Sequence, residues 1–127
     1  MPGTLLYEYA VLRAVPRVER EEFLNVGVVL YCRQRRSLEV RIHLDERRLL
    51  ALAPAADAGN IGAFLDAFAR ICHGEPGAGP IAALDAASRF RWLTATRSTV
   101  LQCSKVHPGL CNDPVETLDR LYRELVL

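Results

Sequence analysis

The stretch NVGVVLYC, residues 25–32, constrains the fold of this chain more than any other segment. It is apolar at nearly every position, which is the pattern of a central strand covered on both faces. After the short polar turn RQRRS, residues 38–44 place apolar side chains at every second position, as a strand with one buried face does. Two such strands joined by a short turn predict neighbouring antiparallel strands.

Two further segments complete the predicted sheet. Residues 5–15 are rich in β-branched and aromatic types and end at Pro16, which has no amide proton for a sheet ladder. Residues 98–106 have the same strand character, and HPGLCN after them has the composition of a loop. We therefore predict a mainly antiparallel sheet of four strands, the first three of which form a meander.

The remaining segments have signals typical of helices. Asp45, Asp57 and Asp113 are placed to cap helices that begin at residues 46, 58 and 114, and Pro80 is placed to open a helix over residues 81–90. About four helices packed on a four-stranded sheet define an α+β fold, in one domain over residues 1–127. The residues expected in the core are Val28, Val29, Leu30, Val40, Ile42, Phe64, Phe68, Val100, Leu118 and Leu121.

Composition narrows the classes of partner. The chain has 16 basic and 15 acidic residues, so it lacks the overall positive charge that favours nucleic acid or anionic membranes. No apolar run is long enough to span a membrane, and the N-terminus lacks the pattern of a signal peptide. We therefore expect a cytoplasmic protein, in which the four cysteines are reduced thiols. Their spacing contains no CxxC pair and so indicates neither a redox motif nor a standard zinc framework.

The densest polar constellation follows the first strand. The segment from Arg17 to Glu22 precedes Asn25 and Gly27, and its charged residues are Arg17, Glu19, Arg20, Glu21 and Glu22. Carboxylates there suit acid–base or metal chemistry, and the arginines suit a phosphate or carboxylate bound through two hydrogen bonds. Charged side chains in this pattern are also typical of a solvated turn, in which Asn25 bonds to nearby backbone, and the pattern favours the turn.

A metal site near the C-terminus is less well supported. Cys103, His107 and Cys111 stand four positions apart, and thiols and imidazoles are zinc ligands. This stretch has strand and loop character, however, and Cys103 fits better as a small apolar core residue. We expect no metal and no cofactor, because no Walker, Rossmann, GxSxG or HExxH pattern is present. Trp92 is expected to be a core or interface anchor.

Two stretches, YEYAVLRAVPRVEREEFLNVGVVLYC and RFRWLTATRSTVLQCSKVHPGLCNDP, resemble the two signatures of the bacterial domain-of-unknown-function family 3037. The resemblance implies no particular reaction. It implies a neighbour, because such proteins are typically encoded beside a HipA-like kinase. The candidate functional surface consists of residues in the two signatures, namely Arg17, Glu19, Arg20, Glu22, Asn25, Arg97, Ser98, Thr99 and His107.

Topology suggests how these residues meet. We expect the turn at 17–25 and the loop at 107–112 to lie at the same end of the sheet, with Arg97 facing Glu19 or Glu22. An internal arginine–carboxylate pair that fixes the turn explains the same residues.

Three functions are consistent with the sequence. The first is a protein-interaction or accessory module for a HipA-like kinase, with an apolar or aromatic-rimmed surface. The second is a small hydrolase or nuclease-like enzyme in which Glu19, Glu22, His107 and the arginines converge in one pocket. The third, nucleic-acid binding through the arginines between residues 33 and 48, has the least support because the net charge is only +1.

Overall fold

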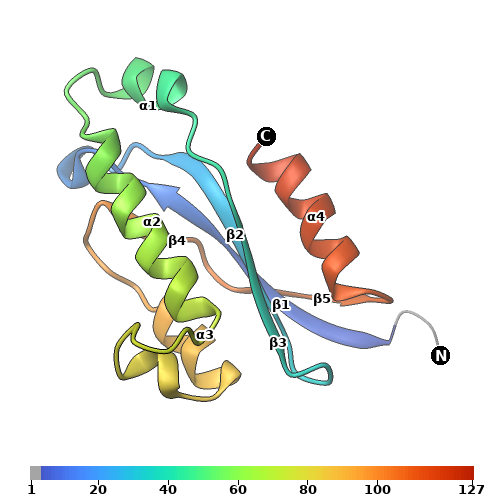
Figure 1. The fold of residues 1–127 in the computed structure, drawn as a ribbon. Coiled ribbons are helices and arrows are strands. Elements are labelled where there is room, and N and C mark those ends of the chain that lie inside the picture. The colour runs from blue at the N-terminus through green and yellow to red at the C-terminus, as the bar shows by residue number, and fades with distance from the viewer. Residues whose placement is uncertain (1–3) are drawn as a thin grey trace.

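The computed structural model describes residues 4–127 and has an α+β fold, as predicted; residues 1–3 of the predicted domain lie outside the described residues. Figure 1 shows an antiparallel sheet with α1, α2 and α3 on one side and α4 on the other. The strands are β1 (Leu5–Ala14), β2 (Leu24–Cys32), β3 (Ser37–Ile42), β4 (Leu101–Cys103) and β5 (His107–Cys111). The helices are α1 (Glu46–Leu52), α2 (Ala58–Cys72), α3 (Ala86–Thr94) and α4 (Pro114–Leu125), with 3-10 turns η1 (Val18–Arg20) and η2 (Ile81–Ala83).

The sheet is organised around β1. Its strand order is β3-β2-β1-β4, and β5 also pairs with β1. On one side β1 pairs with β2, and on the other it pairs first with β5 along Leu5–Tyr9 and then with β4 along Leu12–Ala14. The predicted β1-β2-β3 meander is confirmed, and the sheet has five strands where four were predicted.

Strand β2 is apolar at nearly every position because both of its faces are buried. Val29 belongs to the core beneath α1, α2 and α3, whereas Val28 and Leu30 belong to a second core beneath α4. All three side chains are at most 2% exposed. Helix α4 covers β2 with Leu118 and Leu121 from its apolar face.

Aspartate caps begin all four α-helices. The side chains of Asp45, Asp57 and Asp113 accept hydrogen bonds from backbone N–H groups of α1, α2 and α4, as predicted. The predicted helix over 81–90 is wrong in its extent. Only the turn η2 follows Pro80, and Asp85 then caps the separate helix α3 through the Ser88 N–H.

The predicted strand 98–106 and loop 107–112 also need correction, because β4 is shorter and residues 107–111 form β5. Ser104 lies between the two strands and continues the pairing: its backbone N–H donates to Val11 O, and its Oγ accepts from Val11 N–H, both at 2.8 Å. Val11 forms its backbone hydrogen bonds with this side of the sheet, and so every second residue of β1 does the same. Glu8 is not one of these residues, so Pro108, which lies opposite Glu8, directs its backbone groups away from β1. Proline is tolerated in a strand at such a position, where no amide proton is needed.

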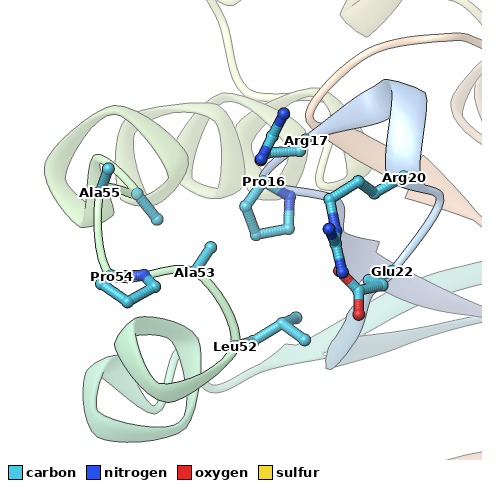
Figure 2. A pocket seen from close by; sticks show the side chains of 9 residues that line it. Pro16, Arg17, Arg20, Glu22, Leu52, Ala53, Pro54 and Ala55 are labelled. Carbon is cyan, nitrogen blue, oxygen red and sulfur yellow. The ribbon is translucent and has the colours of Figure 1, made fainter.

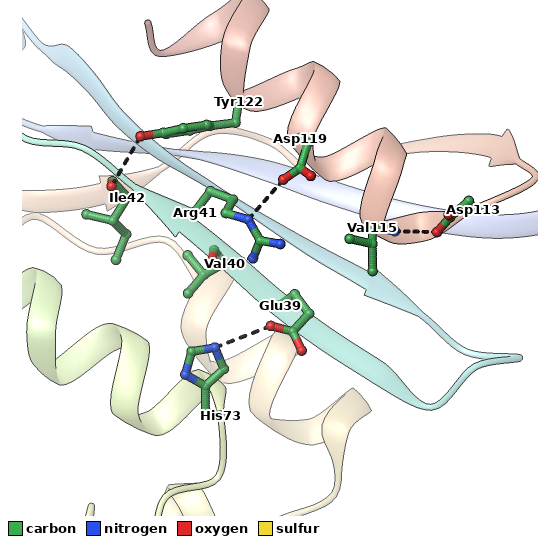
Figure 3. A network of polar contacts seen from close by, with 9 residues as sticks. All are labelled: Glu39, Val40, Arg41, Ile42, His73, Asp113, Val115, Asp119 and Tyr122. Atoms are coloured by element: carbon green, nitrogen blue, oxygen red, sulfur yellow. Dashed lines mark hydrogen bonds and ion pairs between the residues drawn. The ribbon is translucent and has the colours of Figure 1, made fainter.

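Side chains from both helical layers protect the outer edge of β3 (Figure 3). Arg41 Nη1 donates to Val40 O, and the Tyr122 hydroxyl of α4 donates to Ile42 O. Arg41 also donates to Asp119 of α4 at 3.0 Å. On the other layer, His73 Nε2 after α2 lies 3.4 Å from Glu39 Oε2.

Most of the predicted core residues are buried, and three are not. Ile42 is partly buried and packs against the core. Val100 is only partly buried because it lies in the loop before the edge strand β4. Phe64 is 47% exposed, because Ile61, Leu65, Phe68 and Cys72 already fill the face of α2 that contacts the sheet. None of the described helices is both long and apolar enough to cross a membrane.

The contrast between Phe64 and Phe68 is testable. Phe68 is 7% exposed, so Phe68→Ala should lower the free energy of unfolding by about 3–5 kcal/mol through lost burial and a cavity. Phe64→Ala, on the same helix, should cost about 1 kcal/mol or less. Urea denaturation of both variants measures the difference, and equal losses would contradict this assignment of the core.

Gly27 of the NVGV motif is required by close packing of β2 on β3. A Cβ atom there would lie 2.8 Å from Arg41 O and 3.3 Å from the Ile42 side chain. Gly109 of the HPGL motif has a similar role, because the Tyr7 ring occupies the space of its missing side chain. At both positions, close packing leaves no space for a side chain, so glycine is required for the fold.

Replacing Gly27 with alanine should destabilise the fold. The added methyl group meets backbone that cannot move without breaking the β2–β3 pairing, so we expect a loss of about 1–3 kcal/mol in the free energy of unfolding. Gly62→Ala is the matched control, since a Cβ there meets nothing within 4 Å. In helix α2 this substitution should stabilise by about 0.5–1 kcal/mol. Chemical denaturation that ranks the two variants in the reverse order would refute the packing argument.

Candidate functional site

The predicted site residues lie in four separate parts of the fold. Arg17, Glu19, Arg20 and Glu22 are in the turn between β1 and β2, which contains η1. Arg97, Ser98 and Thr99 are in the loop between α3 and β4. Asn25 and His107 are within strands β2 and β5.

The charged turn borders a cleft of about 340 Å³ (Figure 2). Arg17 Nε donates to Glu19 Oε1 at 2.8 Å, and Arg20 Nε donates to Glu22 Oε1 at 2.5 Å. The pKa of Glu19 is lowered by its own backbone N–H and by Arg17, and that of Glu22 is lowered by the hydrogen bond from Arg20. Arginine–carboxylate pairs do fix the turn, but they form within it and do not involve Arg97.

His107 does not lie near this turn. It pairs with Tyr9 in the middle of β1, and its ring lies 5.4 Å from the Tyr9 ring, whereas the turn follows the last residue of β1. The expectation that the segments 17–25 and 107–112 share one end of the sheet is therefore wrong. The enzyme hypothesis required Glu19, Glu22 and His107 to converge in one pocket, and the fold keeps His107 apart.

Asn25 serves to attach α4 to the sheet. Its Nδ2 donates to Leu125 O at 3.1 Å, at the C-terminal end of α4. The side chain points to the α4 side of the sheet and away from the cleft beside the turn, which Asn25 does not line. This contact gives the asparagine of the NVGV motif a structural role.

The three residues considered as zinc ligands are also dispersed. Cys103 packs against the core under α2 and α3, and its thiol donates to Leu93 O. Cys111 belongs to the core under α4, on the opposite face of the sheet. Within residues 4–127, no group of three or more His, Cys, Asp or Glu side chains is arranged to hold a metal ion.

The arginines considered for nucleic-acid binding do not form one surface. Arg33, Arg35 and Arg36 lie in the turn before β3, whereas Arg47 and Arg48 lie on α1 after it. Arg48 Nη1 also donates to Val126 O. The strand β3 separates the two groups, as Figure 1 shows.

A mostly apolar groove, here called the α2–α3 groove, lies between α2, α3 and β4. Its cavity volume is about 270 Å³. Phe64 and Trp92 line the groove, and their side chains are 47% and 40% exposed. The lining residues, most of them apolar, are Phe64, Ala67, Phe68, Ile71, Trp92, Leu93, Arg97, Thr99, Val100, Leu101, Gln102 and Cys103.

Arg97 is the only charged side chain in this lining. Its guanidinium carbon lies 4.3 Å from the centroid of the Trp92 ring, a cation–π contact. It also donates to Leu93 O at 3.2 Å and to Trp92 O, which closes the C-terminal end of α3. These contacts fix the positive charge beside an exposed aromatic ring.

Sequence analysis identified Arg97 and Thr99 but not the groove they border. One signal was present: the apolar stripe of α2 is wider than one contact face, so Phe64 and Ile71 remain beside the buried row. Trp92 was expected to be a core or interface anchor, and its 40% exposure shows that it is not a core residue. The contribution of Leu101 depends on the pairing of β4 with β1, which the sequence does not specify.

Two thiols near the groove are held in the protonated state. Burial raises the pKa of Cys72 to about 12, and the Glu39 carboxylate adds to this effect. Burial likewise raises the pKa of Cys103 to about 11. Cys103 lines the groove as a neutral, apolar group.

These raised pKa values predict a loss of stability at alkaline pH. The folded chain retains thiol protons that the unfolded chain, with a thiol pKa of 9.0, releases. The stabilisation is full below pH 9 and is lost as pH rises toward 11–12, by up to about 1.4 kcal/mol per pH unit for each thiol. Urea denaturation should show that the stability difference between the native chain and Cys72→Ala narrows across this range. A constant difference would contradict the assignment.

Comparisons with known proteins agree with the resemblance seen in the sequence. Residues 9–126 match the model of a family described as "Protein of unknown function (DUF3037)". Comparison with curated proteins and with solved structures found no match. The family match covers nearly the whole chain, which therefore belongs to this family of proteins of unknown function.

Proposed function

We propose that this chain is a protein-interaction module whose α2–α3 groove receives a segment of a partner protein. The observation that carries the proposal is the exposure of Phe64 and Trp92 beside an apolar cavity of about 270 Å³. Large aromatic side chains that remain exposed around an apolar groove are typical of protein-binding surfaces.

The chemistry of the groove describes the segment that it binds. Its lining is mostly apolar, so the segment presents apolar side chains. Arg97 supplies the only charge of the lining, so an acidic residue of the partner lies beside it. Because Arg97 is already held over Trp92, little side-chain entropy is lost when that carboxylate binds.

The partner segment does not bind as an added strand, because this edge of the sheet is blunted. Thr99 Oγ1 donates to Leu101 O at 2.7 Å, and Gln102 Nε2 donates to Thr99 O at 2.8 Å. Pro108 on β5 lacks an amide proton where its backbone faces outward. An amphipathic helix, which docks through side chains alone, is the mode of binding that remains suitable.

The partner proposed for this module is a HipA-like kinase, in the cytoplasm. This choice rests on the genomic neighbourhood that the family resemblance implies, which is an association and not a contact. The groove supports binding of a protein segment of the stated chemistry, and the experiment below tests whether the kinase supplies it.

Co-expression of the chain with the neighbouring HipA-like kinase tests the proposal. Affinity capture followed by size-exclusion chromatography should recover a complex of the two proteins. Phe64→Ala and Trp92→Ala should each weaken the complex at least about tenfold, as removal of a central aromatic anchor does. Val115→Ala is the matched control, because Val115 is 51% exposed on α4, on the other side of the sheet.

The control and the folding of the variants decide how the result is interpreted. Val115→Ala should leave the affinity unchanged, and denaturation curves should show that the groove variants remain folded. Failure of the kinase to bind would refute this partner. Equal affinity of the native chain and both groove variants would refute the groove as the binding surface.

A further inference from the structure

The cleft beside the charged turn is separate from the α2–α3 groove and has a different character. It lies between the turn that follows β1 and the loop that joins α1 to α2 (Figure 2). Pro16, Arg17, Arg20 and Glu22 line one side, and Leu52 with residues 53–56 line the other. The two cavities share no lining residue.

The two arginines at this cleft are held by carboxylates through one nitrogen each. The hydrogen bonds of Arg17 and Arg20 use their Nε atoms, to Glu19 and Glu22. A guanidinium has five N–H donors, so four donors on each arginine are left for another acceptor. The carboxylates thereby orient the guanidinium groups without occupying the paired terminal nitrogens that bind an anion best.

Two arginine–carboxylate pairs determine the charge beside the cleft. Its lining contains two guanidinium groups and one carboxylate, Glu22, which is already paired with Arg20. Glu19 neutralises part of the Arg17 charge from outside the lining. Each arginine is therefore paired with a carboxylate, and an anion would be bound through the guanidinium N–H donors that these pairs leave free.

The opposite wall provides an apolar surface. Leu52 and the segment Ala53-Pro54-Ala55-Ala56 carry no polar side chain, and Pro16 adds a second proline ring beside the arginines. Proline restricts the backbone, so the walls lose little conformational freedom when a ligand binds. The volume of about 340 Å³ is at the lower end of the range for small-molecule sites.

We infer that this cleft is a binding site for a small organic anion. Arg17 and Arg20 bind its carboxylate or phosphate group, and Pro16, Leu52 and residues 53–56 contact its apolar part. The inference goes beyond the proposed protein interaction and does not depend on it. A carboxylate presents two oxygen acceptors in a plane and a phosphate presents its oxygens at the corners of a tetrahedron. Both arrangements match the N–H donors of arginine.

Titration of the full chain with phenyl phosphate, benzoate and inorganic phosphate, in a phosphate-free buffer of low salt, tests the inference. Phenyl phosphate or benzoate should bind in the cleft, measured by calorimetry and by NMR shifts of residues 16–22 and 52–56. The tighter of the two identifies the preferred head group. Inorganic phosphate should bind at least about tenfold more weakly, because it lacks the apolar body.

Three variants locate the site. Arg17→Gln and Arg20→Gln should each weaken binding about tenfold or more, because each removes charge-assisted hydrogen bonds. Ala55→Trp should abolish binding by filling the cleft without a change in charge. Arg91→Gln, an exposed arginine on α3 outside the cleft, is the matched control and should leave binding unchanged.

The outcomes separate this inference from the proposed function. Absence of binding by both organic anions at millimolar concentration would overturn it, as would equal losses in Arg20→Gln and Arg91→Gln. Retention of binding in Ala55→Trp would show that the anion contacts the arginines outside the cleft, which also overturns it. Binding of the kinase to the Arg20→Gln variant is measured in a separate experiment. Because Arg20 does not line the α2–α3 groove, that result tests only the proposed protein interaction.

Discussion

The antiparallel pairing of β1 with β2 positions every other element of this fold. The pairing extends from Tyr7 and Cys32 to Ala14 and Leu24, interrupted by one irregularity after Leu12. It places β2 where both of its faces can be covered, so that one strand contributes to both cores. The other side of β1 is shared between β5 and β4, and β4, which pairs with the last three residues of β1, lines the α2–α3 groove.

The fold forms the α2–α3 groove and the cleft beside the turn in different ways. The α2–α3 groove results from an apolar stripe on α2 that is wider than its contact with the sheet, with Phe64 and Ile71 beside the buried row. The cleft beside the turn results from charged residues placed opposite a short apolar loop. The groove is therefore mostly apolar, whereas the cleft is charged on one side and apolar on the other.

Much of the fold could be predicted because local signals coincided with tertiary contacts. Uniform apolarity identified β2, alternation identified β3, and aspartate caps identified three helix starts. The errors came from residues whose meaning depends on distant partners. Pro108 and Gly109 are typical of a loop, yet they lie in β5, where an outer edge accepts the proline and the Tyr7 ring covers the glycine.

The same dependence on distant contacts explains the candidate site. Charged residues in one turn could be recognised as a group because they are adjacent in sequence, and four of them do lie together. Whether His107 or Arg97 joined that group depended on strand register, which local pattern does not determine. The protected edge of β3 has a further consequence. Because Arg41 and Tyr122 engage the carbonyl groups of Val40 and Ile42, these two acceptors are already occupied, which disfavours extension of the sheet by a strand of a second copy along that edge.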